Sequence, residues 1–165
     1  MRAEVFSSDF TIGIAVFIIA LGIYSVYYEN LQSDVSSYNL RNEMQTKADS
    51  IANLLSTSSG VPSDWDHNTV EILGLKDSNS INLTKFEELK KMNYNVVRSM
   101  LGVGGYNLYI ELKNVSGYTI TNGTDSYFFG SPLDNPSQVF YVERYALSRL
   151  NNTLIKTVMG VVIWQ

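Results

Sequence analysis

The sequence predicts an α+β protein in which a long N-terminal transmembrane and amphipathic helix packs on a C-terminal antiparallel β-sheet. Two observations lead to this fold class. Apolar residues fill an uncharged run near the N-terminus and then recur at helical spacing, with no proline or glycine between Tyr28 and Gly60. After Gly105 the periodicity of the apolar residues changes to two, which is typical of strands.

The chain divides into four predicted segments: a short leader or N-terminus, the transmembrane half of the helix, its amphipathic half, and an extracytoplasmic globular α+β domain, at residues 1–9, 10–28, 29–59 and 60–165. The last segment has the size of one compact domain. The chain contains no cysteine, so neither a disulfide nor a thiolate metal site can form. A net charge of −4 and an isoelectric point of about 4.9 argue against nucleic acid as a partner.

The apolar run at residues 10–28 has the length of a membrane span. A helix of that length extends over about 28 Å, close to the hydrocarbon thickness of a bilayer. Tyr24, Tyr27 and Tyr28 stand at its end, where an aromatic belt marks the membrane interface. A cleaved secretory signal fits poorly, because its apolar core is shorter and a small-residue cleavage site follows it. Arg2 precedes the span and acidic residues follow it, which predicts a single-pass topology with a cytoplasmic N-terminus.

Small residues mark two opposite faces of this span. Gly13 and Ala20 share one face, and Ala15 and Gly22 share the other. Such notches allow neighbouring helices to approach closely, although glycine is also common in membrane helices in general. Asp9, at the inner margin of the span, is either a solvated carboxylate near the helix N-terminus or the partner of an amino group in a neighbouring subunit.

The helix is predicted to extend from about residue 8 to about residue 56, where Ser56–Gly60 interrupts the pattern. A loop then leads to a short strand at 70–73 and a turn at 76–80. Next comes a helix capped by Asn82 or Thr84, which breaks near residues 93–95.

The rest of the chain is predicted to be a meander of strands. Asn122-Gly123 is a strong hairpin signal between two of them. Because all connections are local, the sheet is expected to be antiparallel throughout. The predicted strands are residues 106–113, 118–121, 126–129, 139–150 and 153–164.

In this order of features the chain resembles an archaeal type IV pilin-like protein of the class III signal peptide type. The resemblance rests on the short Met-Arg-Ala leader, on the acidic Glu4 and Asp9 before the apolar run, on the continuous helix and on the C-terminal sheet. It implies that a prepilin peptidase-like enzyme cuts between Ala3 and Glu4, ahead of the helix. Asp9 then lies one position beyond the acidic site that is usual in the family.

The body of the chain is similar to archaeal pilin-like proteins as well, from GVPSDWDHNTVEILGL at residue 60 to the closing strand at Trp164. The resemblance implies a major or minor subunit of a cell-surface filament, with the helix as membrane anchor and then as filament core. Its partners would be membrane lipid and copies of itself or other pilin subunits. The alternative is a single-pass, membrane-anchored extracellular binding domain that does not polymerise.

Four N-x-S/T sequons agree with export of the body. In the predicted structure most of them lie in turns or at the ends of elements, where a glycan can be accommodated. Asn82 is also a candidate helix cap, which is a competing role for that residue. The glycosylation candidates are Asn82, Asn114, Asn122 and Asn151.

The sequence predicts no enzyme, no cofactor and no metal site. His67, the one histidine, is expected to be exposed and idle in a loop. Residues 64–68 place oxygen ligands at alternate positions, as a calcium loop does, but Thr69 stands where such a loop needs glycine and Leu75 where it needs glutamate. Trp65 in the same loop is expected to cover the core as a small lid.

Overall fold

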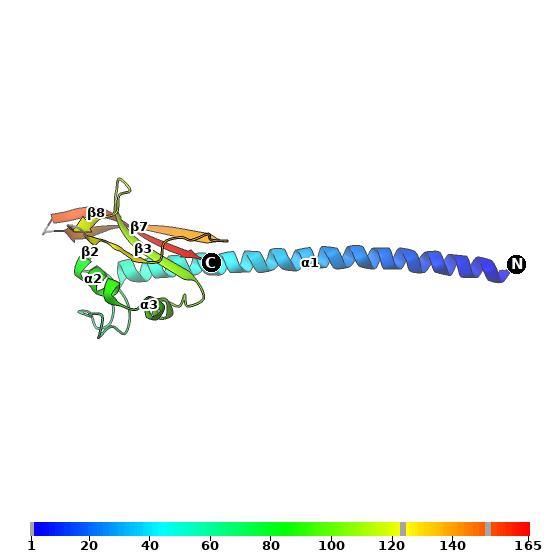
Figure 1. The fold of residues 1–165 in the computed structure, drawn as a ribbon, viewed down its shortest axis with the longest axis horizontal. Helices are drawn as coiled ribbons and strands as arrows, with labels where there is room; N and C mark the ends of the chain where they lie inside the picture. The colour runs from blue at the N-terminus through cyan, green and yellow to red at the C-terminus, as the bar shows by residue number, and fades with distance from the viewer. Residues whose placement is uncertain (1, 123–124, 151–152) are drawn as a thin grey trace. The chain divides into compact units, whose positions relative to one another are not determined.

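The computed structural model describes residues 2–122, 125–150 and 153–165, and within these ranges it does not describe the side chains of residues 2–8, 33, 122 and 125. The chain divides into two compact units, residues 1–42 and residues 43–165 (Figure 1). Helix α1 (Arg2–Thr57) contributes to both units, and each unit is considered by itself.

Helix α1 ends where the sequence predicts and begins earlier. The hydroxyls of Ser56 and Thr57 donate back to carbonyls of the preceding turn, which closes the helix. Gly60 follows with a φ of 83°, a left-handed conformation that suits glycine. At the other end the helix starts at Arg2 rather than near residue 8, because the intervening residues include neither glycine nor proline.

The first unit consists of helix alone, and every described side chain from Asp9 to Asn39 is exposed. An 18-residue window within this helix has a mean hydropathy of 2.2, and none of that window is buried. By length and composition the helix can therefore cross a membrane.

The second unit combines residues 43–57 of α1 with two short helices and a set of strands. The helices are α2 (Leu83–Lys91) and α3 (Tyr94–Met100), each preceded by an asparagine that caps it. The strands are β1 (Lys76–Asp77), β2 (Ser80–Ile81), β3 (Asn107–Asn114), β4 (Thr121–Asn122), β5 (Asp125–Ser126), β6 (Phe128–Gly130), β7 (Val139–Leu150) and β8 (Thr153–Trp164).

The described strands form a mixed sheet in the order β1-β2-β7-β8-β3-β6, while β4 and β5 pair separately. The long ladders, β7 with β8 and β8 with β3, are antiparallel as predicted. The prediction of a wholly antiparallel sheet is wrong at one place, because β2 pairs with β7 in parallel through Ile81 and Ser148. The segment 76–80 is not just a turn but the β1–β2 hairpin, and this hairpin places β2 beside β7.

Other short strands also differ from the prediction. Residues 70–73 form only a bridge between Val61 and Ile72, and residues 118–121 contribute little more than Thr121 to a strand. The break between the two short helices is confirmed, since Asn93 caps α3 directly after α2 ends. The two long C-terminal strands have the predicted bounds.

The core of the second unit lies between the end of α1, the short helices and one face of the sheet. Arg144 of β7 reaches α1 on this side, where it donates to Asp49 at 2.8 Å and to Asn53 at 3.0 Å. Burial of each large apolar side chain contributes about 1.5–3 kcal/mol. The buried side chains include Met44, Ala48, Ile51, Ala52 and Leu55 of α1, Phe86 and Leu89 of α2, Val97 of α3, Leu108, Ile110 and Leu112 of β3, and Met159, Val161 and Ile163 of β8.

Candidate functional site

The first candidate site is the exposed apolar surface of α1 in the first unit. Large side chains along it leave much of their surface open, with Phe10 66%, Phe17 65% and Ile23 67% exposed. Soluble monomers rarely expose a continuous apolar surface of this kind, and such surfaces mark contact with a membrane or with other protein. By length and composition this surface is compatible with a membrane span.

The four predicted packing residues lie on this surface. Gly13 and Ala20 face one side of the helix, and Ala15 and Gly22 face the other, since successive residues turn by about 100°. A Cβ added at Gly13 or Gly22 would meet no atom within 4 Å. The chain's own packing therefore does not require these glycines, and the backbone beside them is open to a partner.

The charged residues at the start of the helix are only partly described. Asp9 is exposed at the margin of the apolar surface. The predicted processing residues Ala3 and Glu4 lie in the helix, but their side chains are outside the described part of the chain.

The side chains of two of the four sequon asparagines are described, and both bond to nearby backbone N–H groups. Asn82 Oδ1 accepts from the backbone N–H groups of Thr84 and Lys85, so the cap that competes with glycosylation is present. Asn114, at the end of β3, accepts from the N–H groups two and four residues further on. In both residues these bonds use the side-chain oxygen and not the amide nitrogen, which is the atom that carries a glycan. Asn122 and Asn151 lie outside the described side chains.

Trp65 covers the core, and its predicted role as a lid is confirmed. The side chain is 2% exposed, and its Nε1 donates to the carbonyls of Ser59 at 3.1 Å and Gly74 at 2.8 Å. These bonds join the two ends of the loop that connects α1 with β1. The backbone is close there, because a Cβ on Gly74 would lie 2.4 Å from the carbonyl oxygen of Ser58.

Lys85 of α2 binds the same loop through its side chain. The side chain is 6% exposed, and its ammonium donates to the carbonyls of Ser59 and Ser63, both at 2.6 Å. Burial lowers the pKa of Lys85, because a cation loses favourable hydration when it leaves water. The ammonium therefore binds carbonyl groups of the protein itself and acts as a structural clasp.

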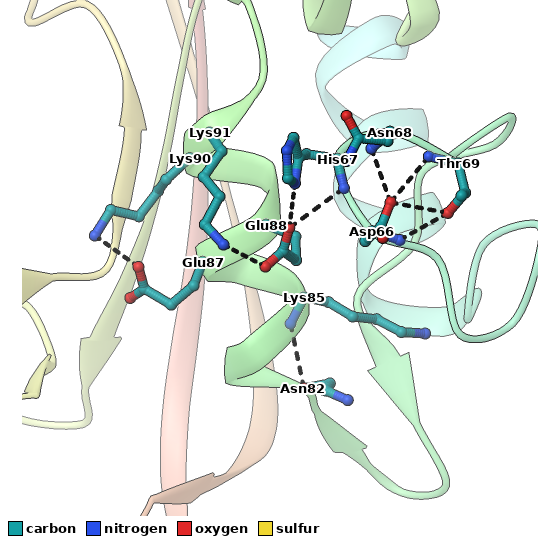
Figure 2. Close-up of polar contacts among 10 residues, drawn as sticks. All are labelled: Asp66, His67, Asn68, Thr69, Asn82, Lys85, Glu87, Glu88, Lys90 and Lys91. Carbon is teal, nitrogen blue, oxygen red and sulfur yellow. Dashed lines mark hydrogen bonds and ion pairs between the residues drawn. The ribbon is translucent and has the colours of Figure 1, made fainter.

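His67 is exposed, as predicted, but it is not idle. Its Nδ1 lies 2.6 Å from Oε2 of Glu88, and Lys91 contacts the other carboxylate oxygen of Glu88 at 2.5 Å (Figure 2). The hydrogen bond from Lys91 and then that with His67 lower the pKa of Glu88 to about 2. Loop and helix are thus joined by a carboxylate between two basic groups.

The polar residues of this loop form no metal site within the described part of the chain. Asp66 Oδ1 accepts from the N–H groups of Asn68 at 2.8 Å and Thr69 at 3.0 Å, so its carboxylate closes a turn. The residues that the structure describes contain no group of three or more metal-ligating side chains.

Replacing Glu88 with glutamine is expected to change how stability depends on pH. The pKa of Glu88 lies below its ordinary value of 4.5 in the folded protein, so its stabilisation is present above about pH 4.5 and is lost as the pH falls towards 2. Thermal unfolding of the detergent-solubilised chain between pH 2 and 6, followed by circular dichroism, should show a shallower fall in Tm for Glu88→Gln. Glu87→Gln is the control, because Glu87 pairs with Lys90 on α2 and does not join the loop to the helix. Equal pH profiles for the native chain and Glu88→Gln would contradict the pairing.

The face of the sheet that bears Gly160 carries a polar network that sequence reasoning did not identify. Tyr141 of β7 lies over Gly160, where an added Cβ would meet its ring at 2.9 Å. The Tyr141 hydroxyl donates to Glu143, and Lys113 contacts Glu111 at 2.5 Å and Tyr141 at 3.4 Å. Partial burial and the bond to Glu143 raise the pKa of Tyr141 to about 12. The four polar side chains of β7 and β3 bond to one another across β8, which lies between these strands. The alternation of polar and apolar residues in β3 and β7 is the only sequence signal for this network.

Two hollows flank the sheet. One, of about 320 Å³, lies beside β7 and is bounded by α1 and the β1–β2 hairpin, with Asn53, Lys76 and Tyr145 among its lining residues. The other, of about 600 Å³, lies beside β6, with Lys90 and Tyr94 among its lining residues.

No protein-family model matches the chain, and neither a curated protein nor a solved structure shows significant similarity to it. The fold and its surfaces define an α+β domain joined to one helix that is long and apolar enough to cross a membrane.

Proposed function

We propose that this protein is a type IV pilin-like subunit, major or minor, of an archaeal cell-surface filament. One observation carries the proposal: α1 exposes an uncharged apolar surface at residues 10–28, while its last part, residues 43–57, supplies core side chains to a folded domain. A helix of this kind serves as a membrane anchor before assembly and as the filament core afterwards. The function is structural and needs no catalytic group.

Assembly exchanges one apolar environment for another, since the helix leaves lipid and packs against copies of itself. The hydrophobic effect contributes little to such an exchange, so close packing between helices must favour the filament. The open backbone at Gly13 and Gly22 supports this step, because small residues on both sides allow two neighbours to approach. Ala15 and Ala20 extend the same two contact faces.

Asp9 is assigned the role of an ionic contact between neighbours. A cut after Ala3 frees the amine of Glu4, and this cation pairs with Asp9 of an adjacent copy. A charge-assisted bond offsets the loss of hydration of both groups when they are buried. The exposure of Asp9 at the edge of the apolar surface supports this role.

The proposal places the N-terminus in the cytoplasm and the second unit outside the membrane. Its partners are membrane lipid, other pilin subunits and a prepilin peptidase-like enzyme. Export also makes the sequons available to glycosylation, and the amide nitrogens of Asn82 and Asn114 are free of the turn-closing bonds of their side-chain oxygens.

Electron microscopy with an antibody to residues 60–165 tests the proposal directly. Labelled surface filaments are expected, and labelled cell envelopes without filaments would contradict it. N-terminal sequencing of assembled material is expected to begin at Glu4, whereas a retained Met1 would count against processing after Ala3.

Replacing Asp9 with alanine is expected to abolish filaments while the protein remains in the membrane. The substitution leaves the amine of a neighbour buried without its counter-charge, which costs about 3–5 kcal/mol for each contact. Filament yield by electron microscopy and membrane content by immunoblot provide the measurement. Asp34→Ala removes an exposed carboxylate from the same helix beyond the apolar span and should assemble normally. Normal assembly of Asp9→Ala would refute the pairing.

A non-polymerising, membrane-anchored binding domain is the second candidate. It is supported by the open hollow beside β6, whose lining includes aromatic side chains such as Tyr94. Under this function the small residues of the apolar helix have no assembly role.

A further inference from the structure

We propose that copies of this chain also join edge to edge, with the outer edge of β7 in one copy accepting β6 of the next. The sheets of successive copies then become continuous. The inference rests on the assembly of copies proposed above and adds a second contact, outside the apolar helix.

The outer edge of β7 is open along most of its length. Among the described strands, β2 reaches this edge only at Ser148. Gln138 and Gln165 exchange main-chain hydrogen bonds at 3.2 and 3.3 Å. Every second residue of β7 after Gln138 therefore bonds to β8 through its main chain, and the main-chain groups of the residues between them point away from β8. The outward N–H and C=O groups are those of Val139, Tyr141, Glu143 and Tyr145.

This edge has little of the protection that free edges usually carry. Proteins protect exposed edges with proline, lysine, bulges or covering elements. β7 pairs with β8 without a bulge and contains neither proline nor lysine. Two of its three charged side chains are engaged within the unit, since Glu143 accepts from Tyr141 and Arg144 binds Asp49, and the third, Arg149, lies beyond Ser148, where β2 pairs with β7. One outward carbonyl, that of Glu143, accepts from Arg144 at 3.0 Å.

The opposite end of the sheet offers a matching edge. Where β3 pairs with β6, the N–H of Leu112 donates to the carbonyl of Tyr127. Because the main-chain groups of successive residues in an antiparallel strand point alternately toward and away from the partner strand, those of Phe128 and Gly130 point away from β3. The outward residues of the two edges lie in register with one another across the sheet. The register aligns Phe128 with Glu111, Glu111 with Gly160, and Gly160 with Glu143.

Strand direction favours a head-to-tail contact between copies. Successive antiparallel ladders make β6 antiparallel to β7, so β6 of one copy can extend the antiparallel order beside β7 of the next. Repeating one such contact leaves the second unit of every copy in the same orientation along its strands. Antiparallel pairing of β7 with β7 would instead invert one copy.

The surroundings of both edges are open. A hollow flanks each edge, which gives room for the elements of a neighbour.

Cysteine cross-linking tests the contact, because the chain has no cysteine of its own. Phe128→Cys is combined in turn with Tyr141→Cys, Glu143→Cys and Tyr145→Cys. Glu143 is the expected partner of Phe128, and the other two variants detect a register shifted by two residues in either direction along β7. Opposed residues in a hydrogen-bonded antiparallel pair have Cα atoms about 5.5 Å apart, within the range of a disulfide. The full-length variants are oxidised in intact cell envelopes and separated by electrophoresis without reductant.

The expected result is a ladder of multimers for at least one double variant. The control pair Phe128→Cys with Asn68→Cys should give no ladder, because Asn68 is exposed in the loop between α1 and β1 and belongs to neither edge. Dimers from Glu143→Cys alone would show a β7-to-β7 contact and overturn the proposal. Filaments without any ladder would overturn the edge contact and leave the pilin function intact. A ladder without filaments would support the edge contact and contradict the pilin function. Absence of both would refute both.

Discussion

Replacing both Gly13 and Gly22 with leucine is expected to abolish surface filaments and to leave the protein anchored in the membrane. Neither leucine meets an obstacle within the chain, since an added Cβ at either position has no neighbour within 4 Å. Leucine is also favourable at the centre of a membrane span. The loss would therefore arise between copies, where the larger side chains hold the helix backbones apart.

The control is the double variant Val16→Leu and Ile23→Leu, which introduces the same two leucines into the same apolar segment. Val16 and Ile23 are already large and 60% and 67% exposed, so the approach distance between helices changes little. Filaments counted by electron microscopy, with membrane content from an immunoblot, give the measurement. Normal filaments from the glycine variant would remove the packing role from both faces and would favour the anchored binding domain.

Replacing Gly74 with alanine is expected to destabilise the second unit by roughly 3 kcal/mol or more, as overpacking against fixed atoms does. The new Cβ would lie 2.4 Å from both the Ser58 carbonyl oxygen and the Gly60 nitrogen. These are backbone atoms, so they cannot move aside without disturbing the end of α1 and the bonds of Trp65. A fall in Tm of roughly 10 °C is expected for a unit of this size.

Gly105→Ala is the control for this prediction. Gly105 also lies in a connecting segment, but an added Cβ meets nothing within 4 Å, and its φ is not in the left-handed region. Its Tm, measured by circular dichroism in detergent, should stay close to that of the native chain. Equal Tm values for both variants would show that the loop at Gly74 can relax.

The elements with strong periodicity could be predicted from the sequence, and those with short-range signals could not. Helix α1 and strands β7 and β8 extend over many residues, so an error at one position does not change their pattern. The two-residue strands β1 and β2 contain no period at all. Their place in the sheet depends on the parallel contact of Ile81 with Ser148, a pairing of residues far apart in the chain.

The candidate sites divide in a similar way. The apolar helix surface and its small residues are visible in the sequence because neither depends on tertiary contacts. The bond between His67 and Glu88 was not predictable, because it joins a loop without periodicity to a helix that follows it in the chain. The network around Gly160 needs the register of three strands, and alternation gives the face of each residue but not its neighbour across the sheet.

Both tryptophans of the chain, Trp65 and Trp164, are buried in the second unit, each 2% exposed. The tryptophan emission of the protein therefore originates in that unit alone, whereas the apolar helix at residues 10–28 contributes only tyrosine emission. The emission spectrum consequently reports the integrity of the folded domain in bilayer, detergent or polymer alike, without an attached label.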